Sequence, residues 1–144
     1  MKILKASKKH IPSIAKIISV LDNEHYHFSD IHHITAHVSK GWYYLALEKN
    51  RPVGAMCLEP TEGSYQIYSI ASQQKGAGRS LIQFAIQKCK KEKIPKLWCW
   101  SLLRYHAVGF YKAMGFKERF LFKKQWYGED CYIFGKTITQ PIKR

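Results

Sequence analysis

The stretch Gln73-Gln74-Lys75-Gly76-Ala77-Gly78-Arg79-Ser80 lies between a strand-like run and a helix-like run. Upstream, Tyr65 to Ala71 is rich in aromatic and β-branched residues, which favour strands. Downstream, Leu81, Ala85 and Cys89 have the spacing of one helix face. A glycine turn that opens a helix leaves backbone N–H groups available to phosphate, and its glycines let an anion approach closely. The stretch therefore predicts a phosphate-binding turn between a strand and a helix.

Two glycines at a helix entry also occur for turn geometry alone, so an isolated Gly-x-Gly is compatible with a helix that binds nothing. Other phosphate motifs fit poorly. The sequence has no G-x-x-x-x-G-K-[ST], and no glycine stands three residues after Gly78, where a dinucleotide fingerprint requires one.

A second segment, Ala107 to Phe116, follows another strand-like run, Leu97 to Trp100. Together the two segments resemble the GNAT superfamily of acyl-CoA-dependent N-acyltransferases. The pyrophosphate loop of that family, Q/R-x-x-G-x-G/A, is matched by Gln73, Gly76 and Gly78. Its later helix, A-x-x-x-Y-x-x-x-G-F, is matched by Ala107, Tyr111, Gly115 and Phe116. With the flanking elements, the resemblance covers nearly the whole chain.

The resemblance implies an α/β (α+β) fold. Its central sheet is mixed and mostly antiparallel, with about six or seven strands and about four helices, and is splayed between the fourth and fifth strands. The residue patterns predict the same order, β-α-α-β-β-β-α-β-α-β-β. The expected strands cover 3–6, 42–48, 53–59, 65–71, 96–101, 116–124 and 131–137. Four helices are expected. The first lies near 11–21, and the second runs through Val38 with Ser29 or Asp30 as its N-cap. The third follows the glycine turn, and the fourth covers 105–114. We expect residues 1–144 to form a single domain, with 138–144 as a loose basic tail.

The cosubstrate implied by the resemblance is acetyl-CoA. Backbone N–H groups from Gln74 to Arg79 would bind its pyrophosphate, and the strand edge would pair with its pantetheine arm. The expected acetyl-CoA-binding residues are Ile70, Ala71, Gln73, Gln74, Lys75, Gly76, Ala77, Gly78, Arg79 and Ser80. Lys75, Arg79 and Lys112 are candidates for the remaining phosphate.

Tyr111 is the expected catalytic residue. The implied reaction is direct attack of a primary amine on the thioester, and the departing thiolate needs a proton. A phenol with a pKa of about 10 can donate to a thiolate whose conjugate acid has a pKa near 8.5. Packing is the alternative interpretation, because Ala107, Tyr111 and Met114 share one helical stripe beside Phe110.

The general base is left unassigned. Many relatives carry a Glu on the strand before the glycine turn, and Tyr65 to Ala71 contains none. Glu59, Glu24, His25 and His27 are candidates, and a water chain or an amine of lower pKa would also serve. Two further departures are a connection from Ile70 to Gln73 about two residues shorter than in relatives, and Arg104 where relatives often carry Asn.

The chain is basic, with 24 Lys and Arg against 10 Asp and Glu, for a net charge of +14. Between Gly63 and Lys117 ten residues are basic and Glu92 is the only acid. Such a field attracts anionic ligands, although lysines near a helix C-terminus are also favoured by the helix dipole. The partners expected are a small-molecule or protein amine, tRNA or another nucleic acid at the basic surface, and a second copy at an unpaired final strand.

The sequence argues against a membrane span, a signal peptide, a C-x-x-C motif and a metal site. No run of about 18 uncharged apolar residues predicts a membrane span, and Lys8 and Lys9 interrupt any signal-peptide core. The four cysteines form no C-x-x-C and predict free thiols in the cytoplasm. His33 and His37 are spaced i, i+4 without the Glu of H-E-x-x-H, so surface or loop-facing histidines rather than a metal site are expected.

These observations favour a cytoplasmic GNAT-fold N-acetyltransferase that transfers acetyl from acetyl-CoA to a primary amine. One alternative is acetylation of the amino group of aminoacyl-tRNA, which resembles toxin-type members of the superfamily. The other is a basic nucleic-acid-binding domain without catalysis.

Overall fold

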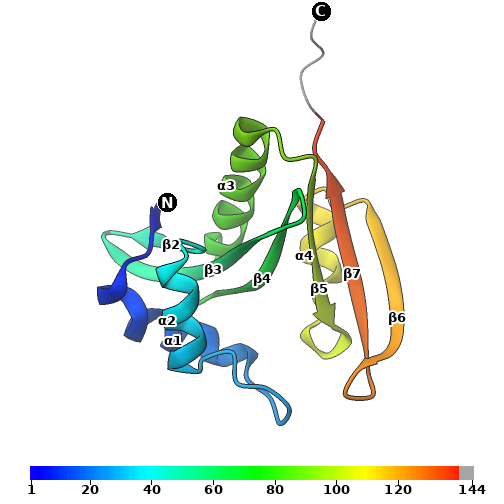
Figure 1. The fold of residues 1–144 in the computed structure, drawn as a ribbon, viewed down its shortest axis with the longest axis horizontal. Helices are drawn as coiled ribbons and strands as arrows, with labels where there is room; N and C mark the ends of the chain where they lie inside the picture. The colour runs from blue at the N-terminus through cyan, green and yellow to red at the C-terminus, as the bar shows by residue number, and fades with distance from the viewer. Residues whose placement is uncertain (140–144) are drawn as a thin grey trace, which may run out of the picture. The chain divides into compact units, whose positions relative to one another are not determined.

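The computed structural model describes residues 1–139, and its elements follow the order expected from the sequence (Figure 1). The strands are β1 Lys2–Lys5, β2 Tyr43–Glu48, β3 Arg51–Thr61, β4 Ser64–Ser72, β5 Lys96–Leu102, β6 Glu118–Trp126 and β7 Glu129–Thr137. The helices are α1 Ile11–Ile18, α2 Ile31–Ser39, α3 Ala77–Glu92 and α4 Val108–Ala113. Short 3₁₀ turns cover Lys8–His10, Ser19–Leu21 and Leu103–Tyr105.

The strands form a seven-stranded sheet in the order β1-β2-β3-β4-β5-β7-β6. β1 pairs with β2, β2 with β3, and β7 with both β5 and β6, all antiparallel. β4 and β5 pair in parallel, with Tyr65 opposite Leu97 and Gln66 opposite Trp98. This mixed, mostly antiparallel sheet confirms the fold class, and the splay between β4 and β5 stays a prediction.

Two compact units make up the chain. The first unit contains Met1–Glu59 and Tyr68–Phe84, and the second contains Pro60–Ile67 and the chain from Ala85 onward. β3, β4 and α3 therefore each contribute residues to both units.

In the first unit, α1 and α2 pack their apolar faces against β2 and β3. Ile14, Ile18 and Ile34 share a buried core with Leu45 and Ala55. Of the two caps expected for α2, Asp30 performs the role, since its side chain accepts the backbone N–H groups of His32 and His33.

The hairpin between β2 and β3 is tighter than the sequence predicted. Lys49 and Asn50 have φ of 51° and 64°, the conformation of a two-residue turn that matches strand twist. Arg51 and Pro52, which lie between the two expected strands 42–48 and 53–59, therefore belong to β3. The register shifts between Ala46 and Leu47 of β2, which pair with Gly54 and Pro52.

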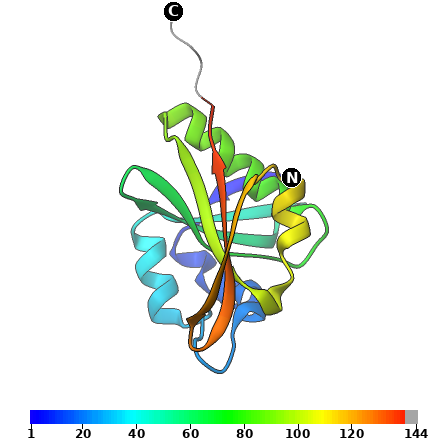
Figure 2. The ribbon, with the colours of Figure 1, turned by 90° about the vertical axis from the view of Figure 1, so that its right-hand side faces the viewer.

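In the second unit, β7 lies between β5 and β6 (Figure 2). The final strand is thus paired on both sides and β6 is the sheet edge, so the expectation of an unpaired final strand was wrong, while a homodimer as such stays a prediction. The helix expected over 105–114 is shorter, because His106 adopts a left-handed conformation (φ 52°, ψ 43°) after the 3₁₀ turn.

The basic tail was expected to begin at Ile138. Ile138 is instead buried and donates its N–H to the Pro95 carbonyl at 2.8 Å. The rest of that tail, from residue 140, lies outside the described residues. Within residues 1–139, no helix has the length and apolar character needed to cross a bilayer.

Candidate active site

The glycine turn is held by three backbone hydrogen bonds. Gln73 N–H donates to the Val53 carbonyl at 2.7 Å, and Ala77 N–H donates to the Gln74 carbonyl at 3.1 Å. Ser80 N–H donates to the Gly76 carbonyl at 3.0 Å, which is the first helical bond of α3. Gly76 has φ of +92°, a conformation that side-chain-bearing residues rarely adopt. The turn therefore requires glycine at position 76 for its backbone geometry.

The first turn of α3 presents donors and positive charge. The N–H groups of Gly78 and Arg79 precede any intrahelical acceptor. Lys75, Gly76 and Arg79 are exposed, and no acidic residue stands in this first turn. A cation at a helix N-terminus opposes the helix dipole, at a cost of roughly 0.3–1 kcal/mol. A bound anion would remove that cost, so the composition of this turn fits a phosphate ligand.

Gly54 on β3 is a supporting residue that the sequence reasoning missed. A Cβ at Gly54 would lie 3.0 Å from Ala77 Cβ and 3.2 Å from Leu81 Cδ1. Ala77 and Leu81 are themselves fully buried. The missing side chain lets the start of α3 close onto β3 and so positions the glycine turn. An isolated glycine inside a strand pattern is the signal that could have found it.

β4 leads directly into the turn. Ile70 is half-buried, and the Ala71 side chain belongs to the core of the first unit. β4 ends at Ser72, and Gln73 is already bonded to β3. The short connection therefore needs no additional residues, while the binding roles of Ile70 and Ala71 stay predictions.

Hydroxyl pairs occupy β4 where relatives often carry a Glu. The Tyr68 hydroxyl hydrogen-bonds with the Tyr26 hydroxyl at 2.7 Å, and the Ser69 hydroxyl with the Tyr43 hydroxyl at 3.2 Å. Burial raises the pKa of both Tyr43 and Tyr68 above 10. Both phenols therefore hold their protons near neutral pH and are poor general bases.

His37 is half-buried, whereas His32 and His33 are exposed as expected. Its ring stacks on Trp42 with centroids 5.3 Å apart and meets the Tyr68 ring edge to face at 4.9 Å. Its Nδ1 is buried and has no hydrogen-bond partner within the described part of the chain. Burial lowers the pKa of His37 below 6.5, helped by the charges of Lys40 and His33. The imidazole is therefore neutral at pH 7.

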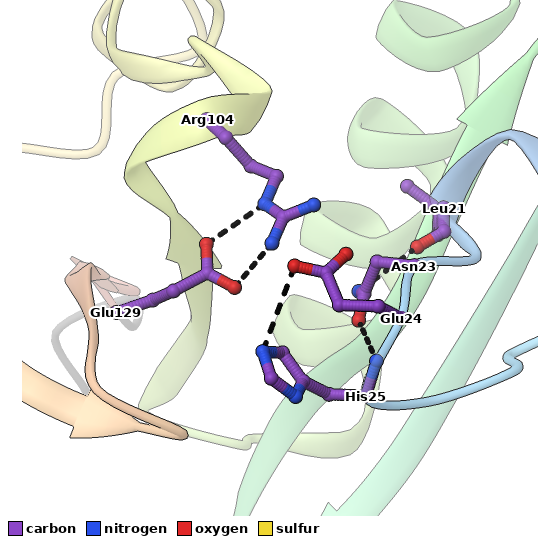
Figure 3. Close-up of polar contacts among 6 residues, drawn as sticks. All are labelled: Leu21, Asn23, Glu24, His25, Arg104 and Glu129. Atoms are coloured by element: carbon purple, nitrogen blue, oxygen red, sulfur yellow. Dashed lines mark hydrogen bonds and ion pairs between the residues drawn. The ribbon is translucent and has the colours of Figure 1, made fainter.

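The candidate bases Glu24 and His25 lie in the loop between α1 and α2 (Figure 3). Asn23 shapes this loop, since its Oδ1 accepts His25 N–H at 2.9 Å and its Nδ2 donates to the Leu21 carbonyl at 3.4 Å. His25 Nε2 lies 3.6 Å from Glu24 Oε1, an ion pair when the imidazole is protonated. His27 is exposed, and Glu59 near the end of β3 is half-buried.

Arg104, which stands where relatives often carry Asn, binds a carboxylate of the same unit. Its Nε donates to Glu129 Oε1 at 2.8 Å and its Nη2 donates to Glu129 Oε2 (Figure 3). This two-pronged bond joins the 3₁₀ turn after β5 to the start of β7. The arginine therefore supplies a positioning interaction of its own at this point of the second unit.

Tyr111 is enclosed by the second unit. Its side chain is only 4% exposed, stacks on Phe134 at 4.7 Å and meets Phe116 edge to face at 5.1 Å. Its hydroxyl hydrogen-bonds with the Cys99 thiol. Burial, reinforced by Cys99, raises the pKa of Tyr111 well above 10. Burial likewise raises the pKa of Cys99 to about 12.

The expected site residues thus fall into two groups. Gln73 to Ser80, with Ile70 and Ala71, lie together in the first unit, whereas Tyr111 belongs to the second. Their joint action stays a prediction, as does a phosphate contact from Lys112 on α4.

Comparison with known proteins identifies the family. The model of the acetyltransferase (GNAT) family matches residues 11–116. No curated protein sequence matches the chain. Among solved structures, the ribosomal-protein-S18-alanine N-acetyltransferase from Escherichia coli superposes with a TM-score of 0.80 at 16% identity, covering 99% of this chain and 97% of that one.

Two further solved structures show the same fold. An aminoglycoside 6'-N-acetyltransferase complexed with coenzyme A gives a TM-score of 0.81 at 14% identity, with 100% of both chains covered. The NatC complex bound to Gag peptide and CoA gives 0.75 at 18% identity, covering 96% of this chain and 100% of that one. Because the family model spans more than half of the sequence, the chain belongs to the GNAT family of acetyltransferases.

Proposed function

We propose that this protein is an N-acetyltransferase that uses acetyl-CoA and acts on a primary amine. The glycine turn that opens α3 carries the proposal. It combines a left-handed Gly76, first-turn N–H donors and two exposed cations, Lys75 and Arg79, with no carboxylate in the first helical turn. These are the requirements of a pyrophosphate site in a chain that belongs to this family.

The residues of the turn would hold acetyl-CoA by its phosphates, and Ile70 and Ala71 would offer the backbone edge of β4. When bound, acetyl-CoA supplies an acyl group activated as a thioester. The chain's task is then to bind the amine, remove its proton and return a proton to the leaving sulfur.

Tyr111 is proposed as the residue that gives its hydroxyl proton to the leaving sulfur. Its raised pKa keeps the phenol protonated throughout the physiological range. The same raised pKa makes the phenol a weaker acid than a thiol, which slows donation. A donor role and a packing role therefore make different predictions for removal of the hydroxyl alone.

The acceptor is proposed as a protein N-terminus or a small-molecule amine. The two kinds of acceptor are suggested by the names of similar structures, one an S18-alanine N-acetyltransferase and the other an aminoglycoside 6'-N-acetyltransferase. A lysine-like amine is only about 0.1% neutral at pH 7.4. Glu24, His25, His27 and Glu59 are candidate bases, and an acceptor with a lower pKa would lessen the need for one.

The experiment is release of free thiol from acetyl-CoA with a panel of peptides and aminoglycosides. We expect saturable turnover with at least one amine, and a loss of at least about 100-fold in kcat for Tyr111→Phe. Tyr127→Phe is the matched control, since Tyr127 is 64% exposed. No turnover with any amine, despite acetyl-CoA binding, would favour the non-catalytic alternative.

Acetylation of aminoacyl-tRNA is retained as a second candidate, favoured by the net charge of +14. It predicts a tRNA complex whose affinity falls steeply with salt, because each phosphate contact releases counterions.

The four cysteines are buried and free, which supports a reducing cytoplasmic compartment.

A further inference from the structure

A basic pocket lies in the second unit, formed by α4, the turn that follows it, β6 and β7. Its volume is about 390 Å³, and its lining residues are Val108, Lys112, Phe116, Lys117, Arg119 and Phe134. None of these residues belongs to the glycine turn. The pocket is therefore a separate feature from the proposed pyrophosphate site.

The fold brings these residues together by simple geometry. Val108 and Lys112 are four residues apart and so share one face of α4. Phe116 and Lys117 follow in the turn, with Phe116 N–H donating to the Tyr111 carbonyl at 3.0 Å. Arg119 on β6 lies opposite Phe134 on β7, so the two side chains share one face of the sheet. Three exposed cations thus line one pocket together with the buried rings of Phe116 and Phe134.

The charges of these cations are not balanced within the protein. No ion pair joins Lys112, Lys117 or Arg119 to a carboxylate within residues 1–139. Glu118, the acid adjacent to Arg119, is bound by Lys96 at 2.5 Å and accepts from the Thr137 hydroxyl at 3.2 Å. The guanidinium of Arg119 lies over the Tyr132 ring, 5.9 Å from its centroid. Like charges around one pocket repel one another unless an anion enters.

The helix dipole accounts for part of this cluster, because Lys112 lies in the last turn of α4. It does not account for Arg119, which is on a strand. The carbonyl at Gly115 near the end of this helix also has a cation, since Lys136 Nζ donates to it at 3.4 Å. Helix capping therefore leaves the convergence of the three pocket cations unexplained.

We infer that this pocket binds a phosphate group. A phosphate carries more negative charge than a carboxylate and offers more acceptor oxygens, which suits two ammonium groups and one guanidinium fork. The group could come from the 3'-phosphate of CoA or from a separate phosphate-bearing ligand. The inference of the pocket itself does not depend on the proposed function.

Inorganic phosphate is the first probe, compared with chloride at equal ionic strength. Thermal unfolding should shift upward with phosphate in the wild type, with half-saturation at roughly millimolar concentration. Arg119→Gln and Lys117→Gln should lose most of this shift. Lys123→Gln removes the same charge from an exposed β6 position outside the pocket and should keep it. Equal loss in Lys123→Gln, or no phosphate shift at all, would overturn the inference.

The source of the phosphate follows from affinities for CoA and for 3'-dephospho-CoA, measured by calorimetry. If the pocket takes the 3'-phosphate, the wild type should prefer CoA by roughly 10-fold, and Arg119→Gln should lose that preference. If the preference is absent while the phosphate shift persists, the pocket serves a separate phosphate-bearing ligand, for which AMP is the next probe. Failure of both CoA forms to bind, with an intact phosphate shift, would contradict the proposed function and leave this pocket supported.

Discussion

The glycine turn and the tyrosine helix both resemble the same family in sequence, yet their structures differ. In the turn, Lys75, Gly76 and Arg79 are exposed, and the positive charge of Arg79 in the first turn of α3 opposes the helix dipole. Tyr111 is enclosed, stacked on Phe134 and bonded to Cys99. A turn that is unfavourable for folding points to a ligand, whereas a fully satisfied side chain fits packing as well as chemistry.

The largest effect should come from Tyr111→Ala. Loss of this buried ring should lower the free energy of unfolding by about 3–5 kcal/mol. Tyr111→Phe, which keeps the ring and loses only the hydroxyl bond to Cys99, should lower it by about 1 kcal/mol. Urea unfolding measures both. A loss below that of Tyr111→Phe for the alanine variant would contradict the enclosure of Tyr111.

Gly54→Ala tests the support of the glycine turn. The new Cβ would press on Ala77 Cβ at 3.0 Å, so we expect a loss of about 1–3 kcal/mol in stability and weaker acetyl-CoA binding. Gly109→Ala is the matched control, since a Cβ there meets nothing within 4 Å and helix propensity should improve. The two variants should differ in sign. If both were neutral, the close approach of α3 to β3 would not position the turn.

These two regions also show how much of the structure can be predicted from the sequence. The order of elements and the glycine turn follow from local signals, namely the change of hydrophobic period and the glycine spacing. The contacts of Gly54 with Ala77, of Tyr26 with Tyr68 and of Arg104 with Glu129 join residues distant in the chain. No local pattern encodes which partner such a residue meets. The half-buried position of His37 has the same origin, since its ring packs against Trp42 and Tyr68.

Alkaline pH probes the enclosed pair Tyr111 and Cys99. Burial raises the pKa of Cys99 to about 12, from a usual value of 9.0 that the unfolded chain should keep. The unfolded state therefore loses its proton first, and the stability contributed by this thiol is fully present below pH 9 and lost as pH rises toward 12. Between pH 8 and about 11, the free energy of unfolding should fall less steeply with pH in Cys99→Ala than in the wild type. The two slopes should differ by up to about 1.4 kcal/mol per pH unit. Parallel curves for the two proteins would show that Cys99 is not enclosed.

The smallest effect on stability should come from Arg79→Glu, which should raise stability and weaken acetyl-CoA binding. An acid in the first turn of α3 should stabilise the free protein by about 0.3–1 kcal/mol through the helix dipole. The same carboxylate should weaken acetyl-CoA binding by repelling its phosphates. Arg79→Gln separates loss of the cation from gain of the anion. A variant that is both more stable and an equal binder would show that the turn does not face the pyrophosphate.

The most direct measurement is calorimetric titration of acetyl-CoA into the wild type and into Gly78→Glu. The account predicts saturable binding to the wild type and a loss of at least about 100-fold in affinity for the variant, because the new carboxylate would stand among the phosphate-binding N–H groups. Retained cooperative unfolding in Gly78→Glu would show that the fold survives. Equal affinity in the two proteins would contradict the assignment of the glycine turn as the pyrophosphate site.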